Sequence, residues 1–259
     1  MTLSISGLTR RYGGLLAVGD VGFEASPGHI TSVIGPNGAG KTTLLNLISG
    51  AVAPDAGTVR LFDTDITHAR PHVRARCGLA RTYQTPQLFD DMTVLDTVKV
   101  GAFLTGRSSF WSAMLRGKKV RSEEADIDRR AREALERVGL GAEHYEREAM
   151  QLAYGLQRRV EIARALAMQP RAILLDEPAA GLNPRETEEI SALFTSLARQ
   201  GLIVVLVEHD MNMVMNISDK VVVMNFGTKI AEGSTTVVQT DQAVIDAYLG
   251  APELEMLDA

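Results

Sequence analysis

The stretch GPNGAGKTT, residues 35–43, decides the expected fold, because it matches the pattern G-x-x-x-x-G-K-[ST] in full. The apolar run ITSVI precedes it, and LLNLISG follows it as an expected helix that ends at Gly50. A strand, a glycine loop and a helix in this order are the context in which the pattern forms a phosphate-binding loop, or P-loop. The flanking elements argue against the alternative of a chance glycine turn.

The residue types in this loop suit a nucleoside triphosphate. Three glycines let the backbone turn its N–H groups toward a phosphate. Lys41 would neutralise the β- and γ-phosphates, and the Thr42 hydroxyl would bind Mg²⁺. We therefore expect ATP and Mg²⁺ as ligands. The expected nucleotide-binding residues of the loop are Gly35, Pro36, Asn37, Gly38, Ala39, Gly40, Lys41, Thr42 and Thr43.

Two carboxylates follow a second apolar run, in RAILLDEPAAGLNP at residues 171–184. The segment AILLD is typical of a parallel strand that is buried on both faces. Ligands of open α/β sheets bind beyond the carboxyl ends of such strands, where Asp176 and Glu177 would lie. Asp176 suits Mg²⁺, and Glu177 suits a general base that polarises an attacking water. Without the P-loop, an exposed acidic strand end with no role would be a serious alternative.

Two further side chains are expected at this edge of the sheet. The strand LIVVLV, residues 202–207, is followed by EHD, which places His209 near a γ-phosphate. A strand over 78–83 leads to Gln84, whose amide could reach the metal or the water. A structural histidine and an ordinary loop glutamine are the alternatives for these two residues.

The stretch LAYGLQRRVEIARAL, residues 152–166, adds a second candidate anion site. A glycine loop that opens directly into an amphipathic helix directs free N–H groups and the helix dipole outward. This candidate site lies more than a hundred residues after the P-loop, so the sequence contains two separate candidate phosphate sites.

The composition sets limits on compartment and partners. The chain has 259 residues, a net charge of −5 and one cysteine, Cys77, which excludes an internal disulfide and fits a reducing compartment. The charge gives no reason to expect nucleic acid as the main partner. No apolar run approaches the roughly 18–20 residues of a membrane span, and we expect no signal peptide.

In their order along the chain, these motifs resemble the ATP-binding cassette (ABC) ATPases over essentially the whole sequence. The resemblance implies an α/β fold: a P-loop core with a mainly parallel sheet and an N-terminal antiparallel β subdomain (1–85 and 159–259), plus an inserted helical subdomain (86–158) that ends in the signature loop. It implies that Tyr12 stacks on adenine, and that Mg²⁺ is held by Thr42, Gln84 and Asp176. Catalytic roles would fall to Glu177, His209 and Gln84.

The resemblance also explains the second anion site. In this family two ATPase subunits face each other head to tail, and each ATP lies between one P-loop and the other subunit's signature loop. The residues expected to act in trans are Leu152, Ala153, Tyr154, Gly155 and Leu156. The common form of the loop is L-S-G-G-Q, so Ala153 lacks a serine hydroxyl that would contact the γ-phosphate. The segment AAGLNP after Glu177 also departs from the usual S-A-L-D.

The chain is similar to ATPase subunits of branched-chain amino acid importers in the stretches LAYG, RRVEIARAL, DEPAAGLNP, VEHDM and VIDAYLG. The resemblance implies two membrane permease subunits, a second, non-identical ATPase subunit or a homodimer copy, and indirectly a periplasmic substrate-binding protein. It implies a peripheral place on the cytoplasmic face of the inner membrane, and no nucleic acid partner. The alternatives are a soluble cassette ATPase acting on nucleic acid or the ribosome, and a lipopolysaccharide-export ATPase.

Part of the inserted region has a helical pattern. Residues 125–140 place five apolar side chains on one face: Ile127, Ala131, Ala134, Leu135 and Val138. Before it, GRSSFWSAMLRGKKVR carries Trp111 among basic residues. This segment is either a short helix with a solvated basic face or a surface near a permease or anionic lipid.

Overall fold

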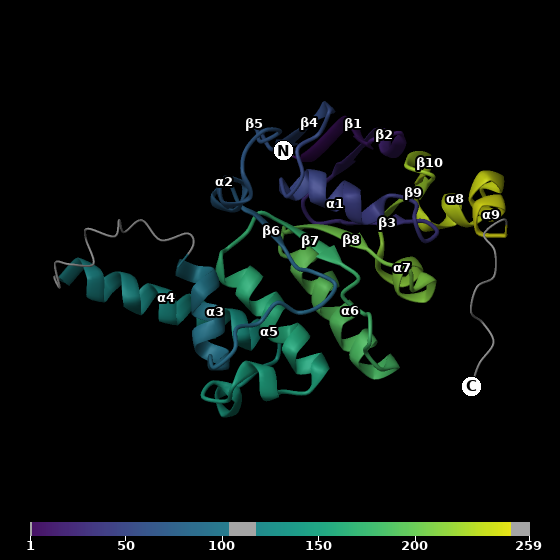
Figure 1. Ribbon diagram of the computed structural model, residues 1–259. Helices are drawn as coiled ribbons and strands as arrows, with labels where there is room; N and C mark the ends of the chain where they lie inside the picture. The colour runs from purple at the N-terminus through teal and green to yellow at the C-terminus, as the bar shows by residue number, and fades with distance from the viewer. Residues whose placement is uncertain (1, 104–117, 250–259) are drawn as a thin grey trace.

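The computed structural model describes residues 2–103 and 118–249. They form two β-sheets with helices between and below them (Figure 1). This arrangement confirms the predicted α/β class, with a mainly parallel sheet, an antiparallel β subdomain and a helical part.

The central sheet has six strands in the order β10-β9-β3-β8-β7-β6. Its strands are β3 (Ile30–Ile34), β6 (Leu79–Arg81), β7 (Ala172–Asp176), β8 (Ile203–Val207), β9 (Lys220–Asn225) and β10 (Thr228–Gly233). All neighbours pair in parallel except β10, which is antiparallel to β9. Every residue of β3, β7 and β8 is buried, as their largely apolar sequences predict.

Strand β6 is shorter than the predicted 78–83. It ends at Arg81 because the chain leaves the sheet beyond Thr82, whose N–H is the last to bond β7, at Leu174 O. The N–H of Tyr83 instead donates to the side chain of Glu161. A side chain from a distant helix thus ends the strand and directs the segment that carries Gln84.

The second sheet is antiparallel, in the order β2-β1-β4-β5. It contains β1 (Leu3–Tyr12), β2 (Leu15–Ala25), β4 (Ala56–Leu61) and β5 (Thr64–Asp65). Helix α1 (Lys41–Ser49) lies between the two sheets (Figure 1), and its apolar side chains share one core with both. The helix ends at Gly50 as predicted.

A helical part extends from the other face of the central sheet (Figure 1). It contains α3 (Val94–Phe103), α4 (Lys118–Arg137), the short 3-10 helices η1 (Ala142–His144) and η2 (Ala149–Gln151), and α5 (Tyr154–Ala167). The five apolar residues predicted on one helical face are all buried in the core that this helical part shares with the central sheet. The boundaries of the inserted subdomain stay a prediction; α5 runs across residue 158. The segment around Trp111 lies outside the described residues.

The remaining helices are α2 (Pro71–Arg76), α6 (Pro184–Arg199), α7 (Met211–Ile217), α8 (Thr235–Gln239) and α9 (Gln242–Leu249). Helix α6 begins with a capping box, in which Asn183 and Glu186 bond each other's backbone N–H. Within the described part of the chain, no helix combines the length and the apolar character needed to cross a membrane.

Candidate functional site

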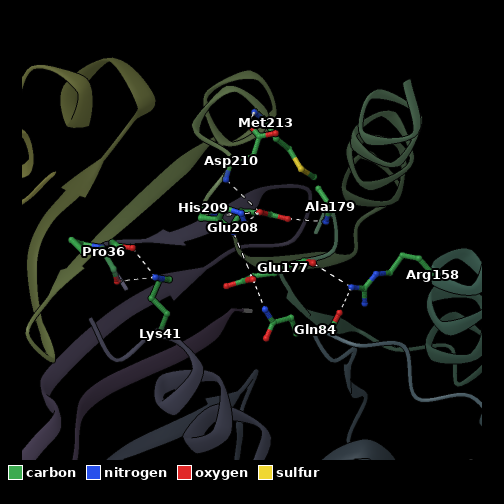
Figure 2. Close-up of polar contacts among 11 residues, drawn as sticks. Pro36, Lys41, Gln84, Arg158, Glu177, Ala179, Glu208, His209, Asp210 and Met213 are labelled. Carbon is green, nitrogen blue, oxygen red and sulfur yellow. Dashed lines mark hydrogen bonds and ion pairs between the residues drawn. The ribbon is translucent and has the colours of Figure 1, made fainter. Parts of the chain in front are cut away.

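The predicted polar residues meet at one edge of the central sheet. Strands β3, β8, β7 and β6 are neighbours and run parallel, so the segments that follow them lie at the same edge. Figure 2 shows Gln84 and His209 beside Glu177 there, with Lys41 across from them at the P-loop. The shared edge follows from parallel topology, because successive parallel strands bring their carboxyl ends to one side.

The P-loop holds Lys41 against its own backbone. The ammonium group donates to the carbonyl oxygens of Gly35 at 2.6 Å and Pro36 at 3.0 Å. Burial lowers the pKa of Lys41, and the nearby carboxylates of Glu177 and Asp176 oppose that shift. A buried cation at this place, close to two carboxylates, is suited to an anionic ligand of high charge.

The loop geometry itself demands glycine at two positions. A Cβ on Gly35 would lie 2.1 Å from the carbonyl oxygen of Met224, and one on Gly40 would lie 2.3 Å from that of Ala17. Gly40 is also the N-cap of α1, which has no side-chain cap, so the first N–H groups of the helix are available to a ligand. These residues fit a phosphate group at the start of α1.

Glu177 stands at the centre of the edge, directly after β7. Its backbone has φ 45°, a value uncommon for a non-glycine residue, and its N–H bonds Val207 O at the end of β8. The amide nitrogen of Gln84 donates to the Glu177 carboxylate at 2.8 Å, and Nδ1 of His209 lies 3.6 Å from the same oxygen. The His209 side chain is 62% exposed, so it can adjust to a ligand.

Asp176 has a partner that the sequence did not reveal. Its carboxylate bonds the Arg81 guanidinium at 3.0 Å, and both side chains are nearly buried. Arg81 also donates to Asn46 and Ser49 of helix α1. The Asp176 carboxylate, an oxygen donor suited to Mg²⁺, therefore lies in a network that connects β7 with α1. The second expected donor, Thr42, is exposed at the start of α1.

Glu208, next to His209, was also missed. Its carboxyl group is completely buried and accepts hydrogen bonds from the N–H groups of Ala179 at 2.8 Å, His209 at 3.0 Å and Asp210 at 3.5 Å (Figure 2). Burial raises the pKa of Glu208, and the N–H donors oppose that rise. This side chain fixes the turn after Glu177 to the segment that carries His209.

Two further predicted regions, Tyr12 and the signature loop, do not belong to the segments that follow the strands at this edge. Tyr12 ends β1 and is half-exposed, with the Arg10 guanidinium 5.0 Å from the centre of its ring. In the signature loop, residues 152–156, Ala153 is the N-cap of α5 and offers no side-chain cap. Gly155 packs so closely on Glu186 that a Cβ would lie 2.5 Å from its Oε1.

A family model described as "ABC transporter" matches residues 18–180. The chain belongs to the ABC transporter family. A second model, "Branched-chain amino acid ATP-binding cassette transporter", matches residues 228–253. The chain is thus an ABC ATPase, as the motifs predict.

Similar proteins cover nearly the whole ABC chain. It is 44% identical to the high-affinity branched-chain amino acid transport ATP-binding protein LivG of Escherichia coli, over 96% of this chain and 97% of that protein. The similar protein BraF of Pseudomonas aeruginosa is 42% identical over the same shares.

Two solved structures resemble the fold closely. A nucleotide-free ATP-binding cassette from an ABC transporter has a TM-score of 0.83 and 33% identity, and covers 96% of this chain and 99% of that one. A dimeric bacterial ABC transporter cassette has a TM-score of 0.76 and 25% identity, over 90% and 98%.

Proposed function

We propose that this ABC protein is the ATP-hydrolysing subunit of an importer for branched-chain or related amino acids. The single observation that carries the substrate class is the 44% identity to a branched-chain amino acid transport ATP-binding protein across nearly the whole chain. The match of residues 228–253 to a model of such transporters supports it from a region outside the ATP site motifs.

In this proposal ATP binds with its phosphates at the start of α1. Lys41 faces the β- and γ-phosphates, Tyr12 stacks on adenine, and Thr42, Asp176 and Gln84 are the residues that would hold Mg²⁺, which supplies charge stabilisation for the phosphoryl group. Glu177 accepts a proton from the water that attacks the γ-phosphorus, and ADP leaves with the cleaved bond's electron pair. His209 contacts the γ-phosphate. The 2.8 Å bond from Gln84 orients the Glu177 carboxylate for this role.

The signature loop serves a second subunit. Two cassettes face head to tail, so that residues 152–156 complete the partner's ATP site, and the dimeric state of a similar cassette supports this assembly. Ala153 contributes no hydroxyl, so the site completed by this loop lacks one charge-assisted hydrogen bond, worth about 1.5–3 kcal/mol. With a second, non-identical ATPase that carries the serine, the site built on this chain's own P-loop performs most of the turnover.

The proposal also places the chain at the cytoplasmic face of the inner membrane. It binds peripherally to two permease subunits, and a periplasmic binding protein delivers the amino acid from the other side. Nucleic acid has no part in this assembly. Closure of the cassette dimer on ATP and its opening after hydrolysis supply the motion that the permeases use.

The experiment combines uptake and hydrolysis in cells that carry the transporter genes. Lys41→Ala should abolish ATP binding, whereas Glu177→Gln should keep binding and lose turnover by about 100-fold or more. Both should stop uptake of labelled leucine, and a surface control, Glu133→Gln, should leave uptake unchanged.

Normal leucine uptake without this gene would contradict the substrate class. Near-normal hydrolysis by Glu177→Gln in the assembled complex would contradict the assignment of the base. Recovery of the protein with ribosomes or nucleic acid rather than with the membrane fraction would favour a soluble cassette ATPase.

A further inference from the structure

Helix α5 carries a buried ion pair that the proposed mechanism has not used. Arg158 and Glu161 lie one turn apart, 2.8 Å between Nη1 and Oε2, and their side chains are 0% and 1% exposed. Burial raises the pKa of Glu161, and its bonds to Tyr83 N–H and Arg158 oppose that rise. Buried ion pairs are costly to form unless further hydrogen bonds satisfy them, so the partners of this pair indicate what it does.

Those partners are the backbone groups of the two catalytic segments. The Arg158 guanidinium donates to the carbonyl oxygen of Gln84 and, at 3.3 Å, to that of Glu177 (Figure 2). It also donates to the carbonyl oxygen of Tyr83. Glu161 accepts the Tyr83 N–H at 3.0 Å. The planar, charged guanidinium of Arg158 therefore fixes the spacing between Gln84 and Glu177. These are the two residues whose side chains share the 2.8 Å hydrogen bond.

The same helix begins at the signature loop. Arg158 follows Tyr154 by four residues, which is about one helical turn, so loop and guanidinium move together as parts of one rigid element. The loop faces the ATP of the second subunit in the proposed dimer. Arg158 touches the residues that act on this chain's own ATP.

We propose that Arg158 is a positioning residue, held by Glu161, that connects the start of α5 to the catalytic pair Gln84 and Glu177. When α5 sits in the arrangement seen here, the guanidinium keeps Gln84 in hydrogen-bond contact with the Glu177 carboxylate. When contact of the signature loop with the partner's nucleotide shifts α5, Gln84 moves with it. The two ATP sites of the dimer thereby communicate through one side chain. This inference rests on the proposed roles of Gln84 and Glu177.

The test uses a double substitution that removes both charges, Arg158→Met with Glu161→Gln, because removal of one would leave the other buried without a partner. Arg158→Lys is the second variant: it keeps a charge beside Glu161, but one ammonium group cannot reproduce the guanidinium fork. Arg159→Met is the matched control. This neighbouring arginine bonds Val138 O and Glu189 and touches neither catalytic segment.

The measurements are kcat, ADP affinity and thermal midpoint, in the transporter complex, each with and without Gln84→Ala. We expect the double variant to lower kcat about tenfold with ADP affinity within about twofold, and Arg158→Lys to give a smaller loss of the same kind. In the Gln84→Ala background the double substitution should lower kcat by less than about twofold further, because both changes remove the same contact. Arg159→Met should leave kcat unchanged.

An unchanged kcat in both Arg158 variants would overturn the proposal, as would losses that multiply fully with the loss from Gln84→Ala. Glu177→Gln, measured in parallel, separates this inference from the mechanism beneath it. If Glu177→Gln retains turnover, the assignment of the catalytic pair fails. If it loses turnover and the Arg158 variants do not, only the positioning role fails.

Discussion

Replacement of Glu208 by alanine should destabilise the fold by about 3 kcal/mol, although the residue touches no expected ligand. Its carboxyl group is fully buried and satisfies the N–H of Ala179, which is itself buried, and the N–H of His209, which water can partly reach. A buried N–H left without an acceptor costs about 1–3 kcal/mol. We assign a loss of about 2 kcal/mol to the unsatisfied N–H of Ala179 and about 1 kcal/mol to that of His209. The 3.5 Å bond from the Asp210 N–H is given no contribution.

Urea unfolding followed by circular dichroism measures this loss as a fall in the midpoint with an unchanged slope. Glu208→Gln keeps the volume and one acceptor oxygen, so its loss should be nearer about 1 kcal/mol. Glu133→Ala, which removes an exposed ion pair with Arg129, is the control and should cost less than about 0.5 kcal/mol. If Glu208→Ala falls in the range of the control, Glu208 does not hold the Ala179 turn in the way that these contacts indicate.

Three further outcomes follow from the same structure. His209→Ala should lower kcat by about 100-fold with little change in ADP affinity, because in the proposed mechanism this exposed side chain beside Glu177 contacts the γ-phosphate. Equal defects in ADP and ATP binding with normal turnover would instead make His209 a structural residue. Arg74→Met should lower the free energy of unfolding in urea by about 3–5 kcal/mol. This buried guanidinium bonds four carbonyl oxygens, and two of them lie in the last turn of α1, which it therefore caps. A loss below about 1 kcal/mol would contradict the capping role. Burial raises the pKa of Glu208, so the wild type loses stability relative to Glu208→Gln as the pH rises above the ordinary glutamate range and through that raised pKa. The gap between their urea midpoints should narrow over this rise in pH, and a widening gap would contradict the raised pKa.

The sequence permitted an accurate prediction of the elements that are defined locally. The runs before the P-loop, before Asp176 and before His209 are buried strands, because a strand covered on both faces is mostly apolar. Their parallel order then brings the polar residues after them to one edge. The apolar face of α4 was equally readable, since helical spacing alone predicts which side chains meet the core.

The buried charges could not be predicted in the same way. Arg158 pairs with Glu161 one turn away, and as sequence this reads as an ordinary exposed ion pair on a helix. Its burial depends on backbone carbonyls about 75 positions earlier, at Tyr83 and Gln84, and no local pattern marks such a contact. The same holds for Arg81, whose partner Asp176 lies 95 positions away. For Arg81, a charged residue inside the largely apolar stretch GLARTY is the trace that the contact leaves in the sequence, whereas Arg158 stands among other polar residues and leaves none.

The two halves of the site differ in how firmly they are held, and this difference bears on how the enzyme works. Arg81 ties the Asp176 carboxylate at the end of β7 to Asn46 and Ser49 of α1, so the P-loop helix and the aspartate form one buried unit. The contacts of Glu177 with Gln84 and His209 are exposed, and one of them is longer than a hydrogen bond. In the proposed mechanism, phosphate binding therefore uses a surface that is already arranged, whereas the groups expected around the attacking water can still change their arrangement. In the proposed head-to-tail dimer, this division lets the nucleotide bind before the partner subunit arrives and lets hydrolysis begin only afterwards.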